Sequence, residues 1–240
     1  MHQKTILIVD DEKEITNLLE IYLKNEDFHV LKFYDSDGVL DCIKNHTIDL
    51  AILDIMLPGT DGFELCQQIR QQWYFPIIML TAKIEDIDKI TGLTMGADDY
   101  ITKPFNPLEV IARVKGQLRR AQMYNRSLGH SESNSEPEHQ DYFVRGLELS
   151  LKNHSCHLYN EEISLTPIEF SILSYLFEHM DKVVSSEELF EAVWKEKYLN
   201  SNNTVMAHIA RLREKLHENG RNPKFIKTVW GIGYMIESKS

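Results

Sequence analysis

Four polar positions each follow a short apolar run, and their side chains suit phosphate chemistry. They are the pair Asp10 and Asp11, then Asp54, Thr81 and Lys103. Because the carboxyl ends of strands in an open parallel sheet meet at one edge, we expect these side chains to lie together. Taken alone, the paired acids could equally well be ordinary acids, either solvated at a strand end or capping the next helix. Lys103 taken alone would be read as a solvated lysine. Their joint pattern favours one shared site.

Three carboxylates in one site raise each other's pKa unless a cation joins them. A hard divalent ion with oxygen ligands, Mg²⁺, fits such a group. An ionised aspartate can then act as a nucleophile toward a phosphoryl group and form an acyl phosphate. The metal and a lysine ammonium would neutralise charge on the phosphoryl oxygens. We therefore expect Asp54 to accept phosphate, Lys103 to contact it, and Thr81 to supply a hydroxyl donor.

The order of elements predicts two domains joined by a linker. Residues 1–122 alternate β-rich runs with helical segments, which indicates a doubly wound, five-stranded parallel sheet of the α/β class. Serines, acids, glycine and proline interrupt any apolar period over 123–141, which is typical of a flexible linker. Residues 142–240 contain short strands, three helical stretches and a hairpin with two glycines. We expect a separate α+β domain there.

Composition places the chain among globular proteins of the cytoplasm. No apolar stretch approaches the roughly 20 residues that span a bilayer, and residues 1–5 lack the core of a secretion signal, so we expect no membrane partner. The three cysteines are widely spaced, which favours reduced thiols over a disulfide or zinc site. The net charge of -11 argues against nucleic acid, but basic side chains prevail between His208 and Lys227.

The segment 202–217 predicts a helix with two different faces. Val205, Ile209, Leu212 and Leu216 form an apolar stripe, and a polar, partly basic stripe lies beside it, at Thr204, His208, Arg211 and Lys215. A basic stripe alone is usually a solvated face. The glycine-rich hairpin at 227–234 follows this helix, and the combination favours a DNA-binding helix with a neighbouring wing.

The chain resembles the bacterial two-component response regulators of the OmpR/PhoB subfamily. The receiver motif matches at Asp10–Asp11, Asp54, Thr81–Ala82 and Lys103–Pro104, and the winged helix-turn-helix matches at 165–170 and 228–234. The resemblance implies a flavodoxin-like receiver whose Asp54 is phosphorylated by a sensor histidine kinase. It also implies Mg²⁺ ligation by Asp10, Asp11, Asp54 and the main-chain carbonyl of Met56, and phosphoryl contacts from Thr81, Ala82 and Lys103. Tyr100 would act with Thr81 as a switch, with a buried core tyrosine as the alternative.

The same resemblance implies a homodimer that forms on phosphorylation. Exposed ion pairs would contribute only about 0 to 1 kcal/mol each, so they would set orientation while apolar contacts supply most of the affinity. Ordinary solvated helix faces are the alternative. The expected pairs are Lys89 with Glu109, Asp99 with Arg113, and Asp98 with Lys115 or Arg120.

For the second domain, the resemblance implies binding to direct-repeat promoter DNA and contact with RNA polymerase. His208 and Arg211 would lie nearest the base edges, while Thr204, Lys215 and Thr228 approach phosphates; Arg213 would meet a phosphate or form an internal ion pair. Asn203 and Trp230 stand where many relatives carry arginine. The wing and the segments 49–60 and 92–105 are most similar to activators of glycopeptide-resistance genes.

Two other functions use related chemistry. Phosphatases of the haloacid dehalogenase type also form an aspartyl phosphate, but they use an Asp-x-Asp motif. Here Ile55 and Met56 follow Asp54, so no second acid can protonate a leaving group, and we expect no enzyme. A flavodoxin-like cofactor binder would instead be yellow as purified.

Overall fold

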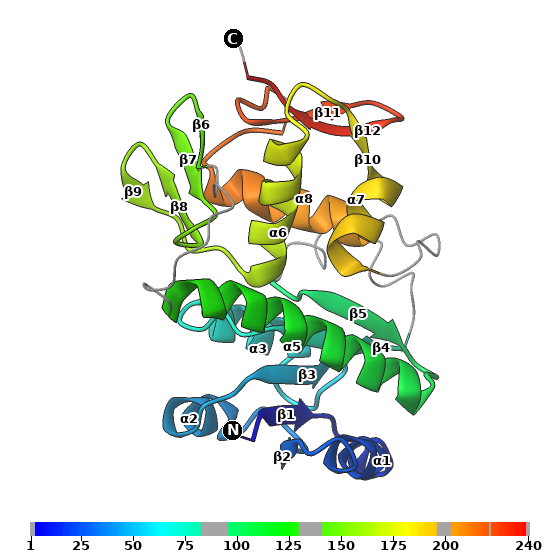
Figure 1. Cartoon of the computed structure of the whole chain (residues 1–240). Coiled ribbons are helices and arrows are strands. Elements are labelled where there is room, and N and C mark those ends of the chain that lie inside the picture. The colour runs from blue at the N-terminus through cyan, green and yellow to red at the C-terminus, as the bar shows by residue number, and fades with distance from the viewer. Residues whose placement is uncertain (1–2, 83–95, 130–140, 196–202, 221, 239–240) are drawn as a thin grey trace. The chain divides into compact units, whose positions relative to one another are not determined.

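The computed structural model describes residues 3–82, 96–129, 141–195, 203–220 and 222–238. The chain divides into two compact units, residues 1–121 and 122–240, and each has a hydrophobic core of its own (Figure 1). Among the described residues, none of the helices is both long and apolar enough to cross a bilayer.

The first unit is a five-stranded parallel sheet with the strand order β2-β1-β3-β4-β5. This confirms the doubly wound α/β fold. The strands are β1 (Thr5–Val9), β2 (His29–Phe33), β3 (Leu50–Asp54), β4 (Ile77–Thr81) and β5 (Asp99–Thr102). The described helices are α1 (Lys13–Lys24), α2 (Val39–Asn45), α3 (Gly62–Arg70) and α5 (Pro107–Gly129).

The central strands β1, β3 and β4 are buried along their whole length. Alternate side chains of a strand point to opposite faces, so the sheet has a core on each side. Leu7 and Val9 belong to one core, and Ile6 and Ile8 belong to the other. This explains why the strands read as continuous apolar runs, which end only where the polar residues begin.

Helix α5 is longer than the sequence predicted. It continues to Gly129, so residues 123–129 of the segment expected as a flexible linker are helical. Several residues that interrupted the apolar period, including Ser127, lie within this helix. Residues 130–140 lie outside the described part of the chain.

The second unit has the α+β composition that the sequence predicted. An antiparallel sheet is followed by three helices and a smaller sheet of order β10-β12-β11. Its strands are β6 (Tyr142–Val144), β7 (Leu147–Ser150), β8 (Ser155–Leu158), β9 (Glu161–Glu162), β10 (Val184–Ser185), β11 (Ile226–Val229) and β12 (Gly233–Ile236). Its helices are α6 (Pro167–Glu178), α7 (Ser186–Trp194) and α8 (Asn203–Lys215).

Local signals define the starts of α6 and α7. Thr166 and Glu169 form a capping box in which each side chain binds the other residue's backbone N–H, and Pro167 opens the helix. Ser185 caps α7 by accepting from the N–H of Glu188. The apolar stripe of α8 packs into the core of this unit through Val205, Ile209 and other stripe residues.

Candidate functional site: an acidic strand edge and a helix with its wing

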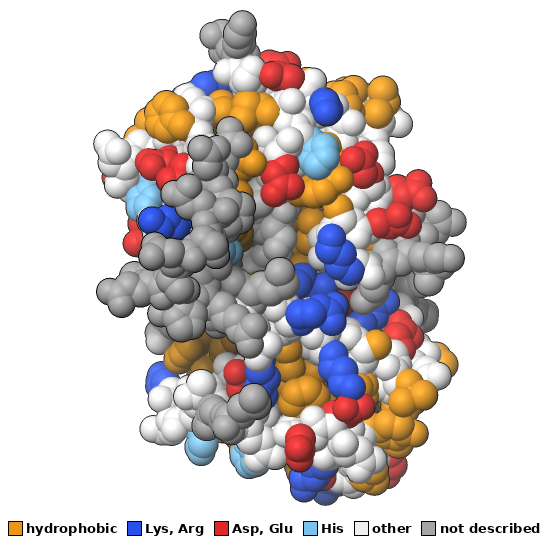
Figure 2. Space-filling model, in the orientation of Figure 1, with side chains coloured by type: hydrophobic (Ala, Val, Ile, Leu, Met, Phe, Trp, Pro, Cys, Tyr) orange, Lys and Arg blue, Asp and Glu red, His pale blue; other side chains and the backbone are white. Residues whose placement is uncertain are grey.

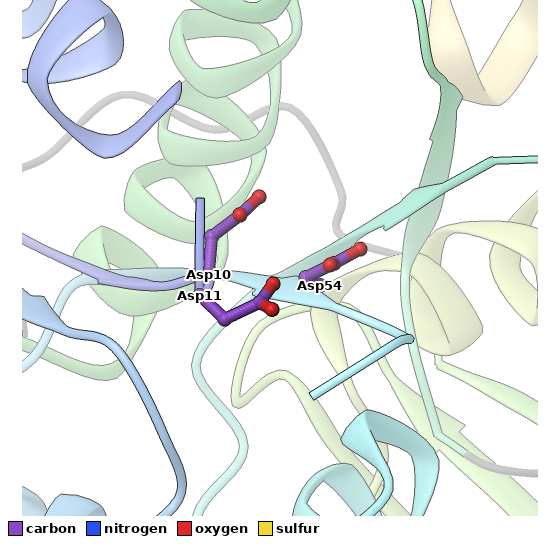
Figure 3. A group of neighbouring side chains, drawn as sticks. All are labelled: Asp10, Asp11 and Asp54. Atoms are coloured by element: carbon purple, nitrogen blue, oxygen red, sulfur yellow. The ribbon is translucent and has the colours of Figure 1, made fainter. Parts of the chain in front are cut away.

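The predicted acids meet at the carboxyl edge of the receiver sheet. Asp10 follows β1 and Asp54 ends β3, and these strands are neighbours in the sheet. One carboxylate oxygen from each of Asp10, Asp11 and Asp54 lies within 4.8 Å of the other two. Figure 3 shows the three side chains at the ends of the two strands. Asp10 and Asp54 are buried, whereas Asp11 is exposed and leaves the group open to solvent.

Lys103 binds two of these acids. Its Nζ lies 2.9 Å from Oδ2 of Asp10 and 3.2 Å from Oδ2 of Asp54. It also donates to Oε1 of Glu12 at 2.9 Å. Glu12 was not among the predicted site residues, although its place directly after the acid pair was a signal for it. The ammonium therefore lies inside the acidic group, as the shared-site prediction required.

Burial and charge act in opposite directions on these groups. Burial raises the pKa of Asp54, although the ammonium of Lys103 and the backbone N–H of Met56 partly offset it. Burial likewise raises the pKa of Asp10 against the opposing effect of Lys103. Burial alone would lower the pKa of Lys103, but its bonds to Glu12 and Asp10 raise the net value. The edge therefore stabilises positive charge and resists additional negative charge that has no counter-ion.

The remaining predicted receiver residues lie on neighbouring strands or in the loops that follow them. Thr81 ends β4 and is 2% exposed, next to the strand that carries Asp54. Tyr100 on β5 is partly buried against one of the two sheet cores. Ala82 and Met56 are exposed at the same edge. The placement of Tyr100 fits both interpretations made from the sequence, and its role as a switch stays a prediction.

Gly62 lies directly against the end of the strand that carries Asp54. A Cβ at this position would lie 1.9 Å from the carbonyl oxygen of Asp54, so only glycine lets α3 begin here. Its N–H donates to the carbonyl of Ile55 at 3.0 Å, and Asp61 caps α3 through the N–H of Phe63. This role of Gly62 was not predicted from the sequence, although the Asp-Gly pair after a Pro-Gly turn was a signal of a close approach.

Several of the expected dimer residues have partners within the chain. Arg113 binds Asp99 at 3.1 Å and Glu109 at 3.0 Å, and Lys115 lies 2.6 Å from Glu26. These contacts leave the predicted pairing across a dimer untested. Lys89 lies outside the described residues, and Arg120 lies on α5.

Asp98 differs from the exposed interface acid that we expected. Its Oδ2 accepts hydrogen bonds from Arg70, the last residue of α3, and from the backbone N–H of Ile77. Arg70 also donates to the carbonyl of Gly96 at 2.7 Å. The carboxylate is held inside the receiver because a buried N–H and a guanidinium both need an acceptor there.

In the second unit, the predicted basic stripe separates into two groups. His208 and Arg211 lie together on α8, with 3.5 Å between Nδ1 and Nη1, and Thr204 is one turn earlier. All three are buried, with Thr204 8%, His208 0% and Arg211 4% exposed, so the expectation that they approach base edges and a phosphate does not fit this placement. Lys215 instead donates to the carbonyl of Ser164 at 2.8 Å and to Glu169 at 2.7 Å. The expectation that Lys215 approaches a DNA phosphate does not fit this placement, because its ammonium is bound at the start of α6.

Of the two roles predicted for Arg213, a phosphate contact or an internal ion pair, the structure shows internal contacts. Its guanidinium donates to the carbonyl of Ile226 and to the hydroxyl of Thr228, both on β11. Trp230 lies in the turn between β11 and β12 and is 90% exposed. The side chain of Asn203, at the start of α8, lies outside the described part of the structure.

Comparisons with known proteins identify both units. The model of the response regulator receiver domain matches residues 6–115, and that of the transcriptional regulatory protein C-terminal domain matches residues 160–236. The regulatory protein VanRc of Enterococcus gallinarum is 62% identical over 232 residues, covering 97% of this chain and 98% of the relative. This chain belongs to the response regulator family, as a transcription regulator of the OmpR/PhoB type.

Two further comparisons support the membership. The regulatory protein VanR of Enterococcus faecium is 55% identical over 234 residues, covering 97% of this response regulator and 98% of the relative. The solved structure of a RitR mutant matches with a TM-score of 0.71 at 25% identity, covering 98% of this chain and all of that one. These relatives are regulators with a DNA-binding domain and not enzymes, so the phosphatase alternative has no support. The receiver implies a histidine kinase partner, and the second domain implies DNA binding.

Proposed function

We propose that Asp54 accepts a phosphoryl group from a sensor histidine kinase in the cytoplasm, at a site that also binds Mg²⁺. The phosphorylated chain then forms a homodimer, binds direct-repeat promoter DNA and activates glycopeptide-resistance-type genes through RNA polymerase. One observation carries the proposal: three carboxylates lie within 4.8 Å of one another, and the ammonium of Lys103 reaches 3.2 Å from Asp54.

The residues at this edge fit a hard divalent cation. They offer carboxylate oxygens from Asp10, Asp11 and Asp54, and the exposed Asp11 gives access from solvent. The main-chain carbonyl of Met56, two residues after Asp54, would complete the protein's share of the ligands. Mg²⁺ keeps several waters and binds through a few carboxylates, which suits an open group of this kind. When bound, the ion supplies positive charge for the phosphoryl oxygens.

The chain's own residues would carry out the transfer. A carboxylate oxygen of Asp54 attacks the phosphorus of the phosphohistidine; a P–O bond forms while the P–N bond breaks, and the imidazole nitrogen leaves with the electron pair. Lys103 already binds Asp54, so its ammonium is in place for the new phosphoryl oxygens. Thr81, at the end of the neighbouring strand, donates its hydroxyl, and Ala82, the next residue, also contacts the phosphoryl group.

Phosphorylation would then control the second domain by linkage. A phosphoryl group adds about 1.5 to 2 negative charges at this edge, which favours a new position of Thr81 and Tyr100 and of the dimer residues beyond them. Pairing of two receivers raises the effective concentration of the second DNA-binding domain once the first has bound. The similarity to VanRc and VanR supports the assignment to glycopeptide-resistance genes.

The proposal is tested by comparing wild-type protein with Asp54→Ala after treatment with acetyl phosphate and Mg²⁺. Gel filtration reports dimerisation, and mobility shifts on genomic fragments selected by the wild-type protein report DNA binding. We expect dimerisation and DNA binding to increase for wild type and for the control Asp41→Ala. The side chain of Asp41 is exposed on α2. Asp54→Ala should remain monomeric. Equal dimerisation and DNA occupancy by Asp54→Ala would overturn the proposal.

A further inference from the structure

A single arginine connects helix α8 to the hairpin β11–β12. Nη2 of Arg213 donates to the carbonyl oxygen of Ile226 at 2.6 Å and to Oγ1 of Thr228 at 2.8 Å. Its Nε donates to the same carbonyl of Ile226 at 3.2 Å. The guanidinium thus spans two alternate residues of one strand. A planar fork of N–H donors can do this, whereas a lysine ammonium cannot reproduce the geometry.

Glu218 holds the same junction from its other side. Its carboxylate accepts from the N–H of Phe225 at 2.6 Å and from the N–H of Ile226 at 3.2 Å. Nε of Arg213 lies 3.8 Å from this carboxylate. The side chains of Arg213 and Glu218 are 14% and 2% exposed, respectively, so the network lies mostly out of water. Buried polar groups joined in this way fix the orientation of the elements that carry them.

The hairpin held by Arg213 ends in an apolar tip. The N–H of Ile232 donates to the carbonyl of Val229 at 3.0 Å, and Gly231 between them has a φ of 73°, which favours glycine. This tight turn leaves Trp230 90% exposed and Ile232 60% exposed. Figure 2 shows hydrophobic side chains over the end of this hairpin. An indole that is almost fully exposed on a short, ordered turn is suited to contact a partner.

We propose that Arg213 is a positioning residue that makes α8 and the Trp230 tip bind DNA as one unit, and that it does not itself contact a phosphate. The inference rests on the proposed DNA-binding function of α8 and the hairpin. A duplex offers its grooves at a fixed spacing, so a helix and a hairpin can engage it together only if their relative orientation is set beforehand. The contact made by Trp230 is apolar and adds little to the salt dependence of binding.

The test measures binding of the full-length, acetyl phosphate-treated protein to a random-sequence DNA duplex as a function of salt. The variants are Arg213→Met, Trp230→Ala, the double variant and Arg213→Lys, with circular dichroism melts to confirm folding. A phosphate contact that is lost reduces the slope of log K against log salt by about 0.9. A lost positioning residue weakens binding without changing that slope. Lys152→Met, in the turn after β7, controls for removal of one positive charge from the same domain.

We expect Arg213→Met and Trp230→Ala each to weaken binding about tenfold and the double variant to be no weaker than either, because both remove the same contact. Arg213→Lys keeps the charge but loses the fork, so it should not restore affinity. In a Trp73→Phe background the other remaining tryptophan, Trp194, is 1% exposed, so acrylamide mainly quenches Trp230. This quenching should fall when the Trp73→Phe protein binds DNA and remain unchanged when Arg213→Met is added. Additive losses, a reduced slope or rescue by lysine would overturn the inference and leave the DNA-binding function intact. Absence of binding by the wild type would overturn both.

Discussion

The acidic edge of the receiver and helix α8 of the second domain place their charged side chains in different ways. At the edge, strands β1, β3 and β5 deliver Asp10, Asp54 and Lys103 to one point, where opposite charges meet. On α8, the basic side chains bind different partners within the domain: Arg213 binds β11, Lys215 binds Glu169, and Arg211 lies beside the buried His208. The strand fixes the direction of a side chain at its end, whereas a long basic side chain on a helix can turn toward either water or the protein.

The largest expected effect is a loss of stability when a closely packed glycine is replaced. It tests whether the stability of each domain depends on a glycine of its own. A Cβ at Gly62 would lie 1.9 Å from the carbonyl oxygen of Asp54, and one at Gly233 would lie 1.9 Å from that of Val184. We expect each alanine substitution to lower the unfolding free energy of its own domain by about 3 kcal/mol or more. Chemical unfolding followed by tryptophan fluorescence reports on the second domain in a Trp73→Phe background and on the receiver in a Trp194→Phe, Trp230→Phe background.

Gly59→Ala is the matched control for these substitutions. Gly59 has a φ of 87°, but a Cβ at this position would have no other atom within 4 Å, so a methyl group meets no clash. Only backbone strain remains, and it costs about 1 to 2 kcal/mol. A Gly62→Ala protein that loses stability equally in both domains would refute the separation of the two regions.

The second effect concerns the receiver edge and its cation. At a Mg²⁺ concentration about 100 times the dissociation constant, binding to the folded form alone raises the unfolding free energy by about 2.7 kcal/mol. Thermal melts with Mg²⁺ and with EDTA should show this gain in wild type and in Asp41→Asn. Asp11→Asn, which removes the exposed member of the acid group, should lose it. An equal gain in Asp11→Asn would show that the ion binds elsewhere.

A smaller effect concerns the core of the second domain at high pH. Burial raises the pKa of the Cys156 thiol from 9.0 to about 12. The unfolded form therefore ionises first, and the stability that the neutral thiol contributes below pH 9 declines as pH rises from 9 to about 12. We expect a loss of about 1 kcal/mol per pH unit relative to Cys156→Ala, measured by urea unfolding. If the unfolding free energies of wild type and Cys156→Ala changed with pH in parallel, ionisation of Cys156 would not be the cause.

The smallest effect concerns an exposed ion pair of the receiver. Lys115 and Glu26 pair at 2.6 Å with side chains 46% and 40% exposed. Lys115→Gln should change the unfolding free energy of the monomer by less than about 1 kcal/mol, because exposed pairs are screened by water. If Lys115 also lies in the proposed dimer, the same variant weakens dimerisation of the phosphorylated protein in sedimentation runs. A large loss of monomer stability would contradict this account.

The sequence predicted the fold and the clustering of Asp10, Asp54 and Lys103 at one edge of the sheet for a physical reason. Apolar runs of strand length that alternate with helical segments are typical of a covered parallel sheet, and the residue that ends each run then lies at the edge of that sheet. Asp10, Asp54, Thr81 and Lys103 all follow from this rule. Glu12 and Gly62 needed knowledge of how the loops after β1 and β3 turn, which no periodicity contains.

The roles of individual charged residues were harder to predict. Helical projection placed Lys215 on the same face as Arg211, but it could not show that the capping residue Glu169 would bind the ammonium. Similarly, Asp98 and Arg70 are far apart in sequence and meet only in the fold. Contacts of this kind depend on tertiary packing. The length of α5 was also underestimated, since polar residues can continue an exposed helix without an apolar stripe.

The central claim is that the convergence of Asp10, Asp11 and Asp54 makes Asp54 the phosphoacceptor. Peptide mapping by mass spectrometry after treatment with acetyl phosphate tests it most directly. The account predicts one phosphoryl group, located on Asp54, formed with Mg²⁺, suppressed by EDTA and absent from Asp54→Asn. A phosphoryl group on another residue, or none on Asp54 in the presence of Mg²⁺, would contradict it.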